Sequence, residues 1–216
     1  MSNKHNLDIL VISCDAYSDV WDIFFKSFHK QWVDCPIKLY LLTNNKSYNS
    51  HHANTIKVGE DISWSDNLLR AIKHLNNDYV LFLLDDLLLK NKISNNYFNQ
   101  ISNWVIKNNP NYLRLCISHK PNYFDELIGK IPQMTPYKTS TMPCIWKKSI
   151  LKDLLKEGES AWDFEINGSK RAYKYDEFYA VYDNFIFYKN GIIKGKWRRS
   201  IIQNKANYGL NIEDLS

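Results

Sequence analysis

The chain has 216 residues, a net charge of +5 and 44% hydrophobic residues. This length and apolar content suffice for one sizeable domain with a buried core and exclude a disordered chain. The charge is only mildly basic, which argues against a dedicated nucleic-acid binder and fits an anionic substrate or membrane surface. No run of 18 apolar residues occurs, so any membrane contact is expected to be peripheral.

The first half of the chain alternates between apolar runs and helical repeats. Buried strands are expected at 7–13, 37–42, 55–58, 79–84 and 112–117. Helices with apolar residues every three or four positions are expected between them, at 18–32, 65–75 and 94–107. Strands that alternate with helices predict an α/β fold with a central, mostly parallel sheet flanked by helices.

The second half is less regular, because prolines interrupt it at Pro121, Pro132, Pro136 and Pro143. We expect a strand at 139–146, helices at 149–156 and 160–171, and a β-hairpin at 185–193 around an Asn-Gly turn. Ser160 and Asp163 fit a capping box at the start of the last helix. No linker or repeat is visible, so residues 1–216 are expected to form one domain, with halves at about 1–118 and 119–216.

The most informative feature is a pair of carboxylates at the end of an apolar run. The run from Tyr79 to Leu84 indicates a central strand, and Asp85 and Asp86 follow it directly. Open α/β sheets bind ligands at the carboxyl ends of their strands. Adjacent like charges repel unless a cation lies between them. The pair therefore predicts a divalent metal site that holds a phosphorylated ligand.

The stretch from Ser65 to Arg70, followed by residues 79–89, resembles bacterial GT-A glycosyltransferases of the family 2-like kind. In both, a capped helix, a polar turn and an apolar strand lead to the acidic motif, and here Arg70 lies sixteen residues before Asp86. The resemblance covers 7–116 in outline and returns at 162–165. It implies a GT-A-like, Rossmann-like nucleotide-binding fold, with a nucleotide-sugar half first and an irregular acceptor-side half after it.

The resemblance implies Mn²⁺ or Mg²⁺ at the acidic motif, on the diphosphate of the donor. Asp86 is expected as a metal ligand, with Asp85 on the metal, the ribose or a water. The family motif is Asp-x-Asp, whereas this chain has Asp85-Asp86-Leu87. Neighbouring side chains of a strand point to opposite faces, so both reach one metal only if the backbone turns. A metal-independent enzyme and a carboxylate pair that only caps a loop stay open.

Three further side chains correspond to donor-binding positions of that family. Asp15 follows the first strand, where the base or ribose is contacted, and Asp66 and Arg70 are expected near the uracil or ribose and near a phosphate. Each has a structural alternative. Asp15 can be a turn residue, and Asp66 and Arg70, four residues apart, can pair on a helix surface.

Residues 160–165 resemble a Trp-x-x-Glu version of the acidic motif in which inverting members keep their base. One carboxylate must deprotonate the attacking hydroxyl, and Glu165 is favoured over Asp163 because Asp163 is well placed as a helix cap. Trp162 is expected under an acceptor sugar, with a core position as the alternative. His119, which follows a predicted strand, is a further acceptor-binding candidate or a plain loop residue.

A basic stretch lies near the end of the sequence, with six Lys or Arg and no acidic residue between positions 189 and 205. The resemblance implies that Lys194, Lys196 and Arg198 contact the donor diphosphate. A solvated tail and a patch that holds the protein to anionic lipid are the alternatives.

These features predict a glycosyltransferase of hexosyltransferase type that moves a sugar from a nucleotide-sugar, UDP-sugar by default, to a glycan or lipid-linked glycan hydroxyl. The expected setting is bacterial surface polysaccharide synthesis, such as capsule or lipopolysaccharide, in the cytoplasm or at the inner face of the membrane. Inversion by direct displacement is favoured, and no nucleic-acid partner is expected. The alternatives are another metal-dependent nucleotidyl or phosphoryl enzyme and a non-catalytic subunit that binds nucleotide or glycan.

Overall fold

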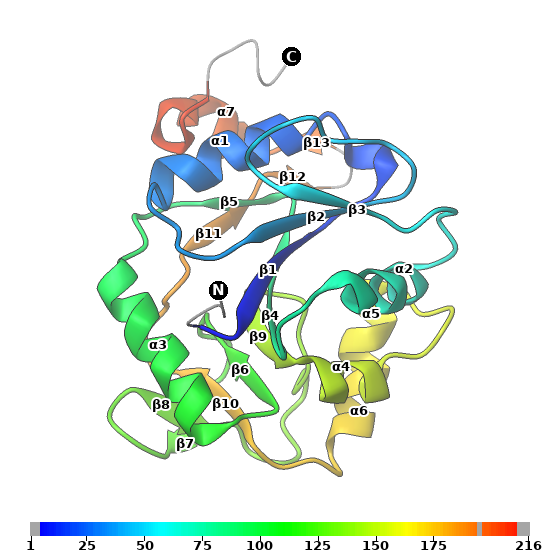
Figure 1. Cartoon of the computed structure of the whole chain (residues 1–216). Helices are drawn as coiled ribbons and strands as arrows, with labels where there is room; N and C mark the ends of the chain where they lie inside the picture. The colour runs from blue at the N-terminus through cyan, green and yellow to red at the C-terminus, as the bar shows by residue number, and fades with distance from the viewer. Residues whose placement is uncertain (1–4, 194–195, 211–216) are drawn as a thin grey trace.

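The structure, a computed structural model, describes residues 5–193 and 196–210. A central sheet runs through it in the strand order β3-β2-β1-β4-β9-β6-β10-β8-β7 (Figure 1). Its strands are β1 (Leu7–Ile12), β2 (Leu39–Thr43), β3 (Asn54–Lys57), β4 (Tyr79–Leu84), β6 (Tyr112–Arg114), β7 (Asn122–Tyr123), β8 (Ile128–Lys130), β9 (Cys144–Lys147) and β10 (Phe178–Val181). The predicted α/β class is confirmed.

The parallel part of the sheet consists of β3, β2, β1 and β4. β1 pairs with β4 over its whole length, from Leu7 opposite Tyr79 to Ile12 opposite Leu84. Both strands are apolar at nearly every position because helices cover both of their faces. This register brings the residues that follow Ile12 and Leu84 to the same edge of the sheet.

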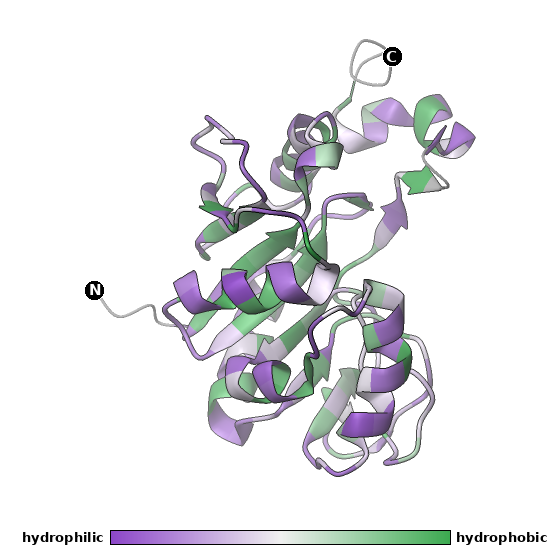
Figure 2. Cartoon of the chain, turned by 90° about the vertical axis from the view of Figure 1, so that its right-hand side faces the viewer, coloured by the Kyte–Doolittle hydropathy of each residue, from purple (hydrophilic) through white to green (hydrophobic). Residues whose placement is uncertain are grey.

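Helices pack on both faces of the sheet and bury their apolar positions against it. On one face lie α1 (Trp21–Gln31) and α3 (Asn95–Asn108), and on the other lie α2 (Trp64–Ala71), α4 (Lys148–Leu154) and α6 (Ser169–Ala172). Figure 2 shows the hydrophobic strands between helices whose outer sides are hydrophilic. Within the described ranges, no helix is both long enough and apolar enough to cross a membrane.

The irregular half completes the same sheet. β9 lies antiparallel between β4 and β6, and β10 is parallel to β6. The strand predicted at 139–146 is shorter and lies at Cys144–Lys147, while β7, β8 and β10 were not predicted. α5 (Ala161–Asp163) begins at Ser160 with the predicted capping box and continues through a π-helical turn, Phe164–Gly168, into α6.

The hairpin predicted at 185–193 is wrong. β11 (Tyr188–Asn190) pairs instead with β5 (Leu87–Leu89), the strand that follows the two carboxylates. All three leucines of β5 are buried, so this pairing gives their backbone groups partners inside the protein. The Asn-Gly signal is local and carries no information about a strand one hundred residues away in the sequence.

The C-terminal segment then returns to the carboxylates and crosses α1. The amide of Gly191 donates to the carbonyl of Asp86 at 2.6 Å. β12 (Ile192–Ile193) pairs with β13 (Lys196–Trp197), and α7 (Arg199–Gln203) and the 3-10 helix Lys205–Tyr208 follow. An apolar cluster that includes Ile23 of α1, Leu88 of β5 and Ile201 of α7 fixes the segment in place.

Candidate functional site

A cavity of about 560 Å³ opens where β1, β2 and β4 end. This is the edge at which open α/β sheets bind ligands, and the volume suits a small molecule or cofactor. The lining residues come from the ends of these strands, from α2 and the loop before it, and from α5 and β12. They include Ser13, Cys14, Tyr17, Asp61, Trp64, Asn67, Asp85, Asp86, Ala161 and Ile192.

Asp85 is buried at the base of this edge, with 7% of its surface exposed. Its Oδ2 accepts a short hydrogen bond from the hydroxyl of Ser13, and Ser13 in turn accepts one from Trp21 Nε1 at 2.7 Å. Burial, with the charge of Asp86 adding to it, raises the pKa of Asp85 to about 7, although the Ser13 hydroxyl acts in the opposite direction. Burial also raises the pKa of Asp86.

The acidic residues of the cavity fit a divalent cation. Asp61 adds a third carboxyl to the wall, and none of the three forms an ion pair with a basic side chain in the described ranges. Nor does the described chain arrange three or more His, Cys, Asp or Glu side chains as a complete metal site. Mn²⁺ and Mg²⁺ are commonly held by one or two carboxylates together with substrate phosphates. Asp85 and Asp86 therefore suit a cation that binds along with a diphosphate.

Arg70 holds the loop in front of α2. Its guanidinium donates to the carbonyls of Val58 at 2.6 Å and Glu60 at 2.7 Å, and to the side-chain oxygen of Asn67 at 2.7 Å. Asn67 donates onward to Asp61 at 2.6 Å. Asn67 and Asp61 line the cavity, whereas Arg70 does not. The structure thus places Arg70 behind the wall, where it fixes two residues that the sequence did not single out.

Asp15 and Asp66 have their carboxylates engaged by backbone amides. Asp15 accepts the amides of residues 44–46 at 2.8–3.0 Å, and although burial acts to raise the pKa of Asp15, these bonds lower it. Asp66 accepts from Ser63, which caps α2, and from the amide of Gly158. Neither lines the cavity, and their donor-binding roles stay predictions.

We expect Arg70→Met to lower the free energy of unfolding by roughly 1–3 kcal/mol, because two carbonyls and one amide oxygen lose a charged donor. The measurement is urea denaturation. Arg199→Met, at an exposed position of α7, is the control and should change stability by less than about 0.5 kcal/mol. An Arg70 variant as stable as the control would contradict the role of this side chain in holding the loop.

Glu165 lies in the π-helical turn, four residues after Ala161 of the cavity wall. Such turns occur frequently at functional sites. Its Oε1 accepts from the amide of Thr141 at 2.7 Å, the hydroxyl of Thr141 at 3.0 Å and the hydroxyl of Ser140 at 3.1 Å. Among the described residues, Oε2 has no hydrogen-bond partner. One carboxylate oxygen is therefore fixed, while the other makes no hydrogen bond to a described residue.

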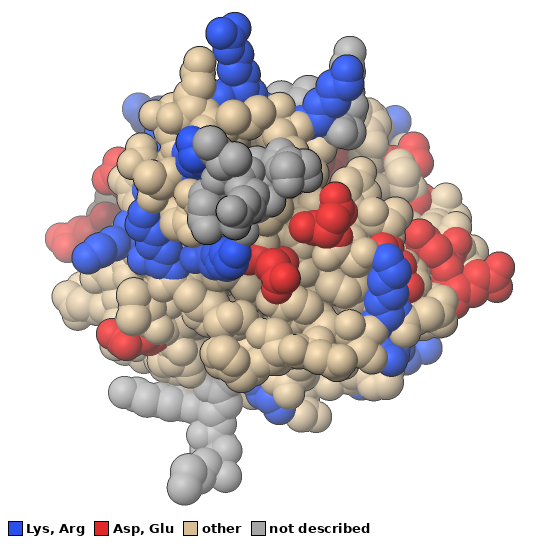
Figure 3. Space-filling view, turned by 90° about the horizontal axis from the view of Figure 1, so that it is seen from above, with Lys and Arg blue, Asp and Glu red and all other residues tan. Residues whose placement is uncertain are grey.

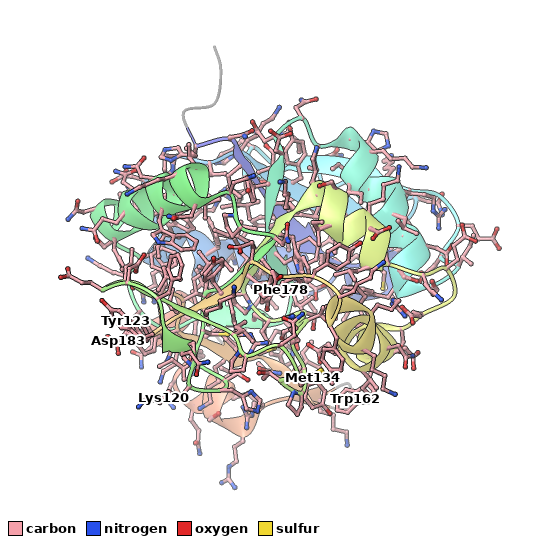
Figure 4. The ribbon with its side chains drawn as sticks, turned by 90° about the horizontal axis from the view of Figure 1, so that it is seen from below. Lys120, Tyr123, Met134, Trp162, Phe178 and Asp183 are labelled. Carbon is pink, nitrogen blue, oxygen red and sulfur yellow. The ribbon has the colours of Figure 1, made fainter. Side chains whose placement is uncertain are left out.

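The other predicted residues of the acceptor half lie at the surface. Asp163 accepts from the amide and hydroxyl of Ser160, and these bonds lower its pKa. Trp162, labelled in Figure 4, is 65% exposed rather than in the core. His119 is exposed and contacts the hydroxyl of Ser118 at 2.8 Å. Acceptor binding by Trp162 and His119 stays a prediction.

The predicted basic residues lie on the segment that begins at the cavity. Lys194 falls outside the described residues. Ile192 lines the cavity, and the amide of Arg198 donates to the carbonyl of Gly191 at 2.8 Å, so β12 and β13 extend from the cavity wall. Figure 3 shows Lys and Arg side chains next to acidic ones on this side of the molecule. Diphosphate binding by Lys196 and Arg198 stays a prediction.

Several cavity residues were missed from the sequence. Ser13 carries the same signal as Asp85, because each directly follows one of two adjacent parallel strands. Trp64 packs against Phe164 with ring centroids 5.4 Å apart, and its indole Nε1 is buried without a partner in the described structure. An orphaned donor in a cavity wall is a candidate contact for a ligand. No sequence signal marked Trp64, because a Trp at the start of a helix more often belongs to the core.

No protein-family model matches the sequence, and a search of curated proteins also finds no match. Solved structures do share the fold. Residues 1–349 of TarS from S. aureus give a TM-score of 0.54 at 13% identity, over 81% of this chain and 59% of that one. The same fragment solved with UDP gives 0.51 at 12% identity, with the same coverage of both chains. This chain thus spans about 59% of the TarS fragment.

Two other solved structures match over nearly their whole length. A UDP-glucose pyrophosphorylase complexed with UDP-glucose gives a TM-score of 0.53 at 9% identity, over 85% of this chain and 92% of that one. A cytidylyltransferase from Leptospira borgpetersenii gives a TM-score of 0.50 at 10% identity, over 95% of this chain and 98% of that one. At these identities the likeness establishes the fold alone.

Proposed function

We propose that the protein is a glycosyltransferase that moves a sugar from a nucleotide-sugar, UDP-sugar by default, to a glycan hydroxyl. The observation that carries the proposal is the placement of two separate acidic groups. Asp85 and Asp86 lie at the edge of the sheet where the cavity opens. Glu165, whose Oε2 has no hydrogen-bond partner among the described residues, follows the cavity residue Ala161 by four positions in the sequence. Direct transfer needs carboxylates near the donor diphosphate and a separate base for the acceptor.

The nucleotide part of the proposal draws on the cavity and on the comparisons. TarS has been solved with UDP, and the pyrophosphorylase of similar fold with UDP-glucose. Asn67, fixed by Arg70, and the unpartnered indole N–H of Trp64 offer polar contacts for a nucleoside. The donor diphosphate lies against Asp85 and Asp86 in this proposal. A divalent cation bound there supplies positive charge against the charge that develops on the leaving diphosphate.

The acceptor part of the proposal centres on Glu165. Its Oε2 takes the proton of the acceptor hydroxyl while the hydroxyl oxygen attacks the anomeric carbon and the bond from that carbon to the diphosphate oxygen breaks. Ser140 and Thr141 hold the carboxylate through Oε1. Attack from the side opposite the diphosphate inverts the anomeric carbon. The exposed ring of Trp162 offers an apolar surface to an acceptor sugar.

The basic segment and the biological setting complete the proposal. Lys196 and Arg198, on the segment that Gly191 anchors to Asp86, provide positive charge for the leaving diphosphate. By the family resemblance, the setting is bacterial surface polysaccharide synthesis, with a glycan or lipid-linked glycan as acceptor.

A nucleotidyltransferase is the second candidate. The observation that favours it is the share of each neighbouring structure that the match covers. This share is 98% for the cytidylyltransferase and 92% for the pyrophosphorylase, compared with 59% for the TarS fragment. Such an enzyme needs the carboxylates at the cavity but not Glu165.

Thermal-shift binding tests the donor assignment. UDP-, GDP-, dTDP- and CMP-sugars are each added with Mn²⁺ or with EDTA. A ligand at a hundred times its dissociation constant stabilises the folded state by about 2.7 kcal/mol, which raises the melting temperature visibly. We expect one nucleotide class to stabilise the protein and EDTA to weaken the effect. No shift with any nucleotide would contradict the donor site.

A further inference from the structure

Three histidines gather where α1 meets the segment 44–53 that joins β2 to β3. The ring of His29, on α1, lies 4.4 Å from that of His52, and His52 lies 4.1 Å from His51, measured between centroids. Nε2 of His29 is buried and has no hydrogen-bond partner in the described structure. The proposed reaction uses none of these residues, which we call the histidine cluster.

The surroundings of the histidine cluster favour neutral rings. Burial lowers the pKa of His29, and His52 and His51 lower it further. Burial and His51 also lower the pKa of His52, against the opposing effect of Asp22 on α1. Among the described residues, Asp22 is the acidic group that acts on the cluster, and its carboxylate already accepts a hydrogen bond from Tyr48 at 2.9 Å.

Two lysines on the elements that carry the cluster are bonded elsewhere. Lys46, at the start of the segment, donates to the carbonyl of Asp15 and the hydroxyl of Ser18. Lys30, the residue after His29, donates to the carbonyl of Ala206. A protonated histidine here meets two other imidazoles, and among the described residues Asp22 is the acidic group that opposes its charge.

Stacking on α1 holds the same segment. The rings of Tyr48 and His52 stack on Phe25 with centroids 5.0 and 6.1 Å apart. Tyr48 also meets the edge of Trp21 at 5.9 Å, and Trp21 bonds to Ser13, the partner of Asp85. The segment therefore carries two histidines of the cluster and, through Tyr48, contacts side chains that support the cavity.

We propose that the histidine cluster is an acid-sensitive latch, in which uptake of protons releases segment 44–53 from α1 and loosens the support behind Asp85. A histidine whose pKa is depressed in the closed state binds a proton more readily when the segment opens. The stability of the closed state is therefore complete above the ordinary histidine pKa of about 6.5 and declines as the pH falls below it. For each proton taken up on opening, the equilibrium constant for opening of the segment rises about tenfold when the pH falls by one unit. The inference does not depend on the proposed function.

Hydrogen exchange read by mass spectrometry tests the latch with the whole chain. Exchange of segment 44–53 is compared with that of β4 at pH 7.5 and pH 5.5, so that the change in intrinsic exchange rate cancels. We expect the protection of the segment, relative to β4, to fall at least tenfold at the lower pH. The variant carrying His29→Phe and His52→Phe keeps the aromatic stack without the two histidines whose pKa burial lowers, and its relative protection should change less than about threefold.

The control is His74→Gln, which removes an exposed histidine far from the cluster and should behave like the wild type. If the double variant does not fold, His51→Gln replaces it, and its loss of protection should be smaller than that of the wild type. Relative protection that does not change with pH, or that falls equally in the wild type and in the variants of the histidine cluster, would overturn the proposal.

Discussion

Replacement of Glu165 by Gln is expected to lower kcat roughly a thousandfold, within the range observed for loss of a general base. The dissociation constant of the nucleotide-sugar should stay within about twofold, because Glu165 lies outside the cavity lining. The Gln side chain has the same shape and its oxygen still accepts from Thr141, so the loss reflects the missing base rather than a moved helix. Steady-state kinetics with the donor identified by thermal shift, together with calorimetric binding, separates the two quantities.

Asp163→Asn is the matched control, since it lies two residues away and its carboxylate only caps α5. We expect its kcat to change less than about threefold and its stability to fall slightly, as cap substitutions do. A large loss of kcat in Asp163→Asn with an unaffected Glu165→Gln would assign the base to Asp163. Equal, small effects in both variants would contradict a carboxylate base in this helix.

Removal of the second carboxylate, in Asp86→Ala, is expected to weaken binding of the nucleotide-sugar about a hundredfold in the presence of Mn²⁺, or about 2.7 kcal/mol. The reason is that Asp85 is deeply buried and hydrogen-bonded to Ser13, which leaves the half-buried Asp86 as the more accessible carboxyl for a diphosphate-bound cation. Isothermal calorimetry with Mn²⁺ and with EDTA measures both the affinity and its dependence on metal.

Asp78→Asn is the control for this variant, because Asp78 is exposed and precedes β4 at the end opposite the cavity. It should leave the affinity within about twofold. An Asp86→Ala variant that binds as tightly as this control would show that the carboxylate has no part in donor binding. A wild-type affinity that is the same in Mn²⁺ and EDTA would instead favour the metal-independent form of the site.

Local signals in the sequence predicted several features correctly. Ser160 was placed correctly as a helix cap, and the carboxylate pair does follow a buried central strand. These features depend on residues within one turn or one strand, so the pattern alone determines them. The class of the fold followed from the alternation of such elements and is confirmed.

Other parts of the site depend on contacts between distant segments. Ser140 and Thr141 hold Glu165 although they lie 25 and 24 residues before it. The loop that carries Asp61 takes its shape from carbonyl groups bonded to Arg70, and carbonyl groups leave no trace in a sequence. These bonds of Arg70 to the protein itself could not be predicted from the sequence, and its phosphate-binding role stays a prediction.

The C-terminal segment shows how a strong local signal is overridden. Asn190-Gly191 is typical of a hairpin turn, yet β11 pairs with the buried leucines of β5. Burial of Leu87–Leu89 required a partner strand, and tertiary context decided which segment supplied it. That pairing is also what brings Gly191 to Asp86.

The products formed from a UDP-sugar test the proposed reaction most directly. The protein is incubated with the nucleotide-sugar that stabilises it and Mn²⁺, with and without pyrophosphate, and phosphorus-31 NMR identifies the phosphate species. A glycosyltransferase releases the nucleoside diphosphate by transfer to an acceptor or to water, and pyrophosphate does not enter the products. We predict that the nucleoside diphosphate forms, and that its formation is lost in Glu165→Gln. Nucleoside triphosphate and sugar 1-phosphate, formed only with pyrophosphate and unaffected by Glu165→Gln, would contradict the proposal and identify a nucleotidyltransferase.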